Sequence, residues 1–310
     1  TTINKVCGSG MKATMLAHDI LKAGSADIVV AGGLESMTRA PYLLGKARFG
    51  YRFGHSEVLD HMALDGLQNA ADRKAMGEFA ELCASKYTFT REEQDAYSAE
   101  SVRRALAAQA DGKFAAEIAP VTVAGRKGDV VISSDEEPPA CDIGKIGSLR
   151  PAFKKDGTVT AASSSKISDG AAALVVTRSE VASAKGLTPL ARIVAHATHA
   201  QEPEWFTTAP VGAIQKVLAK AGWAVGDVDL FEINEAFAVV AMAPIRELGI
   251  DHAKVNVNGG ACALGHPIGA SGARLIVTLI HALKDRGGKR GIASLCIGGG
   301  EATAIAIEVL

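Results

Sequence analysis

Apolar and polar residues change in blocks along the chain, and the blocks predict alternating strands and helices. Residues 2–6 (TINKV) read as a short strand, the glycines of 7–10 as a turn, and apolar residues at helical spacing predict a helix from Met11 to Ala23. Residues 27–33 (DIVVAGG) then read as a buried strand. The start of the chain is therefore expected to be a strand, helix, strand unit.

The same order recurs near the C-terminus. Residues 254–260 (KVNVNGG) predict a strand, 265–272 (GHPIGASG) a turn, 273–283 a helix and 291–300 (GIASLCIGGG) a further strand. Ser9-Gly10 aligns with Ser271-Gly272 in this internal repeat. Two such units predict two similar α/β halves with parallel strand pairing and right-handed crossovers.

The region between the halves differs from them in composition. Residues 38–168 carry scattered Gly and Pro, and one strong helix is predicted from Arg91 to about Ala110, where Thr90 and Glu93 form a capping box. A stretch this long predicts an inserted subdomain that covers a site. Residues 168–179 return to a strand-like pattern and rejoin the first half. The expected division is therefore a first half at 1–37 and 169–189, an inserted loop and coenzyme A-binding subdomain at 38–168, and a second half at 190–310.

Composition narrows the class of protein. The 310 residues are 48% hydrophobic and 22% charged, which is typical of a globular chain with a sizeable core. A formal net charge of −1 gives no general attraction to nucleic acid or anionic lipid, and no apolar run approaches the roughly 18 residues of a membrane span. Neither nucleic acid nor membrane is expected as a partner.

The five cysteines are odd in number and lack CxxC spacing. This usage favours free thiols in a reducing compartment, so a cytoplasmic location is predicted. His196 and His199 lie three residues apart, but no third ligand of suitable spacing is evident, and no metal site is predicted.

Three reactive side chains stand at glycine turns: Cys7 in NKVCGSGMKA, His266 in GHPIGASG and Cys296 in LCIGGG. Cys7 precedes a helix whose N-terminus should lower the pKa of its thiol and favour the nucleophilic thiolate. Two alternatives are a small buried cysteine and a dinucleotide-binding turn, although the next strand ends in glycines rather than the acidic residue such a turn requires.

Polar residues in two further segments suggest stabilisation of an oxyanion. The glycines after Cys296, from Gly298 to Gly300, offer backbone N–H groups, with a tight bend as the alternative. Asn234 and Glu235 interrupt the apolar run EINEAFA, and buried polar groups need partners; a cap for the following helix is the alternative.

Four segments, NKVCGSGMKA, NEAFA, NVNGGACALGHPIGASGAR and CIGGG, resemble the signatures of the thiolase family in the family's order. The resemblance implies a layered αβαβα fold of two similar halves with an inserted loop subdomain. Family members carry further strands and helices before the position of Ile3. The first half is therefore expected to lack its initial strands, which leaves an exposed sheet edge and raises the alternative of an inactive fragment or coenzyme A-binding scaffold.

The resemblance also implies roles for individual residues. Cys7 matches the nucleophile that takes up an acyl group, His266 the base that activates it, and Cys296 the acid/base group of the carbon–carbon step. Asn234 matches the residue that forms an oxyanion hole with His266 through a water, and the backbone N–H groups of Cys7 and Gly298 match a second hole. Ser165 matches a contact of the pantetheine arm, and Phe153 and Phe237 match apolar positions beside it.

Substrates and assembly follow from the same resemblance. The expected reaction is the reversible condensation of two acetyl-CoA to acetoacetyl-CoA, without a metal or a permanently bound cofactor, in a homodimer or homotetramer. Residues 41–62 (PYLLGKARFGYRFGHSEVLDHM) most resemble the short-chain, acetoacetyl-CoA-forming members. A 3-ketoacyl-CoA thiolase of fatty-acid breakdown is the nearest alternative, and a ketoacyl synthase, which uses two histidines, is a more distant one.

Overall fold

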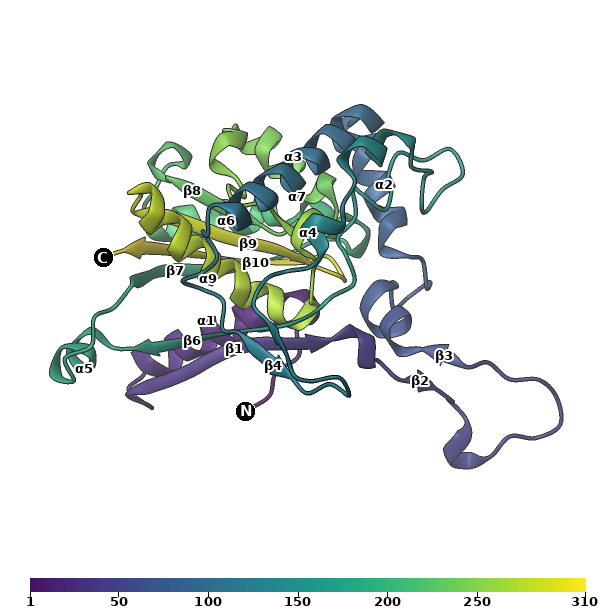
Figure 1. Cartoon of the computed structure of the whole chain (residues 1–310), viewed down its shortest axis with the longest axis horizontal. Coiled ribbons are helices and arrows are strands. Elements are labelled where there is room, and N and C mark those ends of the chain that lie inside the picture. Colours follow the sequence, from purple (N-terminus) through teal and green to yellow (C-terminus); the bar gives the residue numbers. More distant parts are fainter.

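The computed structural model describes all 310 residues, and a four-stranded sheet lies at its centre (Figure 1). The strand order is β7 (Ala191–Ala200), β10 (Glu301–Val309), β9 (Arg290–Ile297) and β8 (Leu230–Ile233). β8 pairs with β9 in parallel, whereas β10 is antiparallel to both of its neighbours. All four residues of β8 are buried, as expected for a strand covered on both faces.

Helices cover both faces of this sheet. α6 (Ala209–Ala221) and α7 (Ala238–Leu248) contribute to a core cluster of 34 buried residues on one face. α1 (Ser9–Lys22) and α9 (Ile268–Arg286) form a second cluster of 14 buried residues on the other face. Two separate apolar cores therefore hold the second half together. The core that includes α9 is shared with the first half, because α1 contributes to it.

The first half contributes a two-stranded sheet beneath α1 and α9 (Figure 1). β1 (Ile28–Ser36) and β6 (Asp169–Thr177) pair antiparallel over nine residues. The prediction of parallel pairing in this half was wrong, because the partner of β1 is a strand that returns from the inserted region rather than one that follows a crossover helix. Val30, Leu34 and Val175 on the outer face are 68–76% exposed.

The two helices of the predicted internal repeat, α1 and α9, pack against each other. A Cβ on Gly10 would lie 2.8 Å from the backbone nitrogen of Ala273, and a Cβ on Gly272 would lie 2.4 Å from that of Met11. The two aligned Ser-Gly pairs thus meet at the contact between the helices. Only glycine allows backbones to approach so closely.

The inserted region places most of its structure over the second half. α3 (Arg91–Ala110) has the predicted bounds and the predicted Thr90–Glu93 capping box, and it packs on α8 (Ala261–Leu264). α2 (Met76–Tyr87) packs on α7. The remaining short elements are β2 (Tyr42–Leu43), β3 (Leu59–Asp60), β4 (Val121–Val123), β5 (Val130–Ile132), α4 (Glu137–Ala140) and α5 (Ser179–Ala184).

Several boundaries differ from those predicted. Residues 2–6 do not form a strand, since no neighbouring strand pairs with them. Residues 254–260 form only a single bridge, between Val255 and Phe231. α9 starts at Ile268, five residues before the predicted start. The domain division stays a prediction. None of the helices combines the length and apolar character needed to cross a membrane.

The contact between α1 and α9 gives a stability prediction. We expect Gly272→Ala to lower the free energy of unfolding by about 2 kcal/mol or more, because overpacking against a backbone atom outweighs the roughly 1 kcal/mol gained in helix propensity. Urea unfolding measures this difference. Gly147→Ala is the matched control, since its Cβ would enter open space. Equal stability of Gly272→Ala and the control would contradict the prediction.

Candidate active site

Cys7 lies in a strained turn that leads into α1. Residues Val6–Gly8 form one turn of 3₁₀ helix, and Val6 has a φ of +48°, which is rare for a β-branched residue. Ser9 stabilises the turn, because its Oγ donates to the carbonyl of Val6 at 2.7 Å and accepts from the N–H of Lys5 at 2.9 Å. The turn thus fixes Cys7 immediately before the helix, as predicted.

The environment of the Cys7 thiol differs from the prediction. Burial raises its pKa to about 11, although the backbone N–H of Gly298 donates to the sulfur and lowers the pKa in part. The expected lowering at a helix N-terminus was wrong, because desolvation of a thiolate outweighs the nearby donors. Cys7 therefore rests as a neutral thiol and needs a base to become a nucleophile.

His266 is the residue predicted to act as this base. It lies in the loop between α8 and α9, and its Nδ1 is 2.5 Å from Oγ of Ser271. Since that hydroxyl donates to the carbonyl of Pro267 at 2.9 Å, it accepts from Nδ1–H. The hydrogen bonds thereby assign the proton to Nδ1 and leave the lone pair of Nε2 free to accept.

The charge state of His266 agrees with that role. Its side chain is buried, and burial together with the positive charge of Arg274 lowers its pKa to about 4. The imidazole is consequently neutral at neutral pH and able to take up a proton.

Cys296 lies at the end of β9, beside Cys7. It is buried, and burial followed by the charge of Cys7 raises its pKa well above the ordinary value. The chain then turns sharply, with φ of +97° at Gly299 and +92° at Gly300. This turn presents the Gly298 N–H to the Cys7 sulfur, so the two segments from opposite ends of the sequence meet as predicted.

Asn234 lies against His266, as predicted. Its Nδ2 is 3.4 Å from Nε2 of the imidazole, and its backbone N–H donates to the carbonyl of Ser294 at 3.0 Å. Its Oδ1 is buried without a hydrogen-bond partner. The alternative of a helix cap is wrong, since Phe237 holds the N-cap position of α7.

Glu235 forms a buried network that sequence reasoning did not find. Its carboxylate accepts from the hydroxyls of Tyr97 at 3.0 Å and Ser101 at 2.7 Å, from Nδ2 of Asn256 at 2.7 Å and from the backbone N–H of Cys262 at 3.0 Å. These donors come from α3 and from the segment that leads to His266. Glu235 thus joins the inserted region to the second half directly behind the site.

The three residues predicted to bind substrate come together. The backbone N–H of Ser165 donates to the carbonyl of Ala236 at 3.0 Å, and the rings of Phe153 and Phe237 pack edge to face with centroids 5.9 Å apart. Met76, which the sequence did not single out, lies with its sulfur 3.5 Å from where a Cβ on Gly298 would be. The inserted region therefore provides an apolar wall beside the reactive groups.

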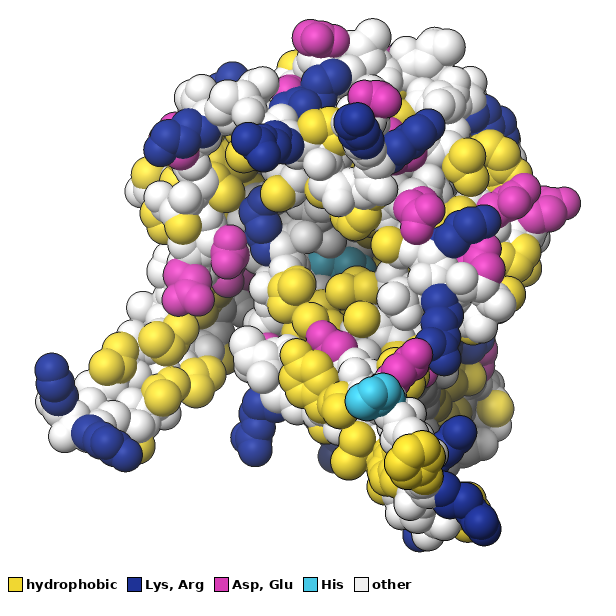
Figure 2. Space-filling view, turned by 90° about the vertical axis from the view of Figure 1, so that its right-hand side faces the viewer, with side chains coloured by type: hydrophobic (Ala, Val, Ile, Leu, Met, Phe, Trp, Pro, Cys, Tyr) yellow, Lys and Arg dark blue, Asp and Glu magenta, His cyan; other side chains and the backbone are white.

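A hollow opens on the face at the right of Figure 1. Figure 2 shows it with a histidine at its floor and Lys and Arg side chains along its upper rim. A neighbouring cleft of about 720 Å³ shares Phe153 with the site but contains none of Cys7, His266 and Cys296, and carboxylates outnumber amines in its lining. That cleft is unsuited to a phosphorylated substrate; its charged residues are Asp72, Lys74, Glu78, Glu81, Lys154, Glu202 and Glu204.

The arrangement defines a class of chemistry. A thiol with backbone N–H groups at its sulfur, a second buried thiol, and a neutral imidazole just before the helix that packs against the Cys7 turn are the parts of a cysteine-dependent acyltransferase. Sequence profiles of the thiolase N-terminal and C-terminal domains match residues 1–180 and 187–309. The chain belongs to the thiolase family.

Individual relatives agree with this assignment. Acetyl-CoA acetyltransferase 2 of Arabidopsis thaliana is 51% identical over 100% of this chain and 78% of its own length. The crystal structure of the Bacillus anthracis acetyl-CoA acetyltransferase has a TM-score of 0.96 and 45% identity, over 100% of this chain and 78% of that one. Human mitochondrial 3-ketoacyl-CoA thiolase has a TM-score of 0.95 and 40% identity, over the same shares. The expected thiolase fold is confirmed.

The lowered pKa of His266 predicts how stability depends on pH. The pKa of His266 is 6.5 in the unfolded chain and about 4 in the folded chain. As pH falls through this window, the unfolded chain binds the proton first, which stabilises the unfolded state relative to the folded one. The stability that neutral His266 provides at pH 7 is therefore lost by about pH 4. We expect the unfolding free energy of the wild type relative to His266→Asn to fall by on the order of 3 kcal/mol between pH 7 and pH 4. Denaturant titrations at each pH measure it; a constant difference would contradict it.

Proposed function

We propose that this chain is an acetyl-CoA C-acetyltransferase (EC 2.3.1.9), which condenses two acetyl-CoA to acetoacetyl-CoA and free coenzyme A, reversibly. The observation that carries the proposal is the convergence of Cys7 and Cys296 at the Gly298 turn, with His266 held by Asn234 and Ser271. Substrates are coenzyme A thioesters, and the chemistry uses no metal.

In the first half-reaction an acetyl group moves to Cys7. The sulfur attacks the thioester carbonyl while Nε2 of His266 accepts the thiol proton. The bond to the coenzyme's sulfur then breaks, and the departing thiolate takes that proton. The oxyanion formed in between accepts hydrogen bonds from the backbone N–H groups of Cys7 and Gly298.

In the second half-reaction Cys296 moves a proton to or from carbon. Cys296 first gives its thiol proton to Nε2 of His266, its thiolate then takes a proton from the methyl carbon of a second acetyl-CoA, and the resulting enolate attacks the acetyl carbonyl on Cys7. The Cys7 sulfur leaves and takes the proton that His266 holds, while Cys296 keeps the proton from carbon, so the enzyme returns to its starting form. A thiol of raised pKa is a strong base once it is ionised, which suits removal of a proton from carbon. Asn234 and the protonated His266, acting through a water, stabilise the enolate oxygen.

The related activities are less favoured. Among solved structures, the Bacillus anthracis acetyl-CoA acetyltransferase is more similar in sequence than the human 3-ketoacyl-CoA thiolase, at 45% against 40% identity. A ketoacyl synthase would need two histidines, whereas here the second acid/base position is Cys296. Ser165, Phe153 and Phe237 are proposed to line the path of the pantetheine arm, and the basic rim in Figure 2 supports binding of a phosphorylated coenzyme.

Self-association, as a homodimer or homotetramer, is part of the proposal. The hairpin of β2 and β3 projects from the body of the molecule (Figure 1). It exposes Phe49 at 92%, Tyr42 at 70% and Val58 at 61%, and Phe53 is fully exposed. Side chains of this size are usually covered by another protein surface. A cytoplasmic setting, in the metabolism of fatty acids, is also proposed; five unpaired cysteines support a reducing compartment.

The division of labour between the two cysteines can be tested by mass spectrometry. We expect brief incubation with acetyl-CoA to add one acetyl group, which peptide mapping places on Cys7 and which Cys7→Ala abolishes. Cys296→Ala should still be acetylated but should lose condensation by about 10³-fold, the usual scale of a lost acid/base group. Cys141→Ala, which removes a partly exposed thiol outside the site, is the control. Loss of acetylation in both Cys7→Ala and Cys296→Ala would refute these roles.

The role of the projecting hairpin can be tested by sedimentation. We expect Phe49→Ser combined with Phe53→Ser to shift the chain to smaller species, because apolar surface that would be buried between copies is lost. Leu187→Ser removes an apolar side chain that is 47% exposed elsewhere and should leave the distribution unchanged. Analytical ultracentrifugation that finds the same species in all three proteins would argue against association through the hairpin.

A further inference from the structure

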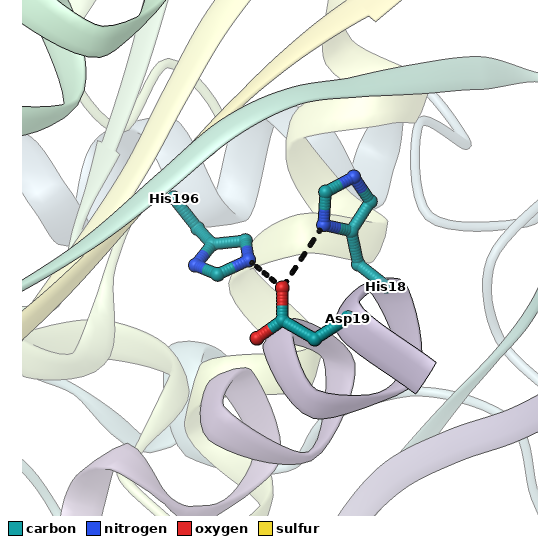
Figure 3. Close-up of side chains that lie close together, drawn as sticks. All are labelled: His18, Asp19 and His196. Atoms are coloured by element: carbon teal, nitrogen blue, oxygen red, sulfur yellow. Dashed lines mark hydrogen bonds and ion pairs between the residues drawn. The ribbon is translucent and has the colours of Figure 1, made fainter. Parts of the chain in front are cut away.

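A cluster of two histidines and one carboxylate lies where the two halves meet (Figure 3). His18 and Asp19 belong to α1, and His196 belongs to β7. Oδ1 of Asp19 lies 3.0 Å from Nε2 of His196 and 3.6 Å from Nδ1 of His18. His199, by contrast, points to Oε1 of Gln201 at 3.0 Å and takes no part.

An ordinary ion pair does not explain this cluster. The contact between His196 and Asp19 is a normal hydrogen bond, but Nδ1 of His18 is buried, has no hydrogen-bond partner and faces the same carboxylate oxygen. A separation of 3.6 Å is too long for a hydrogen bond. Nδ1 of His18 and Oδ1 of Asp19 therefore face each other with no hydrogen bond between them.

The geometry is close to that of a metal site. Zinc binds imidazole nitrogen and carboxylate oxygen at about 2.0–2.2 Å, so the donors of a tetrahedral site lie about 3.3 Å apart. The observed separations of 3.0 and 3.6 Å bracket that value, and all three donor atoms lie within 4.8 Å of one another. Two imidazoles with one carboxylate form a donor set that suits zinc and neighbouring divalent metals.

We propose that His18, Asp19 and His196 bind one Zn²⁺ ion that links α1 to β7. The side chain of Asp19 is 54% exposed, which allows the ion to reach the site and leaves room for a water as a fourth ligand. The positive charge of Lys22 acts against the ion, so moderate rather than extreme affinity is expected.

The site is structural rather than catalytic. His18 lies nine residues beyond Ser9, about 14 Å along a helix that rises 1.5 Å per residue. The ion is therefore remote from Cys7, at the other end of α1, and takes no part in acyl transfer. Because it binds the folded chain through both halves, it adds to the stability of the contact between them.

Calorimetric titration of the full chain with ZnCl₂ tests the site, after iodoacetamide has blocked the accessible thiols so that they cannot compete for the metal. We expect one equivalent to bind. His196→Gln and Asp19→Asn each remove a metal ligand. Losing a residue that only positions a ligand typically weakens metal binding by about 10–100-fold, so losing a ligand itself should weaken it further. His61→Gln is the matched control, because His61 lies 3.1 Å from Asp65 with no second histidine beside it.

Thermal unfolding provides a second readout. Zinc should raise the melting temperature of the wild type and of His61→Gln but not of Asp19→Asn, whose exposed position on the helix tolerates the change. Asp19→Asn should also be acetylated on Cys7 like the wild type. The proposal is overturned if the wild type binds no zinc, if Asp19→Asn binds it as tightly as the wild type, or if His61→Gln loses it equally.

Discussion

The close contact between α1 and α9 is the constraint on which the rest of the structure depends. Gly10 and Gly272 let the two helix backbones touch, and Glu35 of β1 accepts from the N–H of Gly269 in the first turn of α9 at 3.0 Å. Since Cys7 directly precedes one helix and His266 the other, this single contact brings both to one place. A bulkier residue at either glycine would separate the nucleophile from its base.

Burial at this contact sets the chemistry as much as the residues themselves do. Desolvation raises the pKa of both Cys7 and Cys296 and lowers that of His266, so all three groups rest uncharged. Charge appears only when a proton moves, and the donors that stabilise it, such as the N–H of Gly298, are already in position. Such fixed donors act more strongly in a dry site than in water.

The sequence allowed several local elements and the meeting of the Cys7 and Cys296 segments to be predicted, but not what depends on distant partners. The helix of Arg91–Ala110 was predictable because its cap and its spacing are local. Residues 2–6 and 254–260 have strand-like composition, yet strands form only beside a partner. The pKa of Cys7 was predicted in the wrong direction for the same reason, because desolvation depends on the residues packed around the thiol. The partners of Glu235 span positions 97 to 262, so no local pattern could indicate them.

The reaction depends on how firmly the two halves are held together. In the proposed mechanism the first half supplies Cys7 and the second supplies His266, Cys296 and Asn234, so a small displacement between the halves would separate the acyl group from the groups that move its protons. The glycine contact fixes α1 at the end near Cys7, and the cluster of His18, Asp19 and His196 joins the other end of the same helix to β7. A helix fixed at both ends cannot tilt about the glycine contact. Interactions remote from the acyl group can therefore preserve the geometry of the site without touching the substrate.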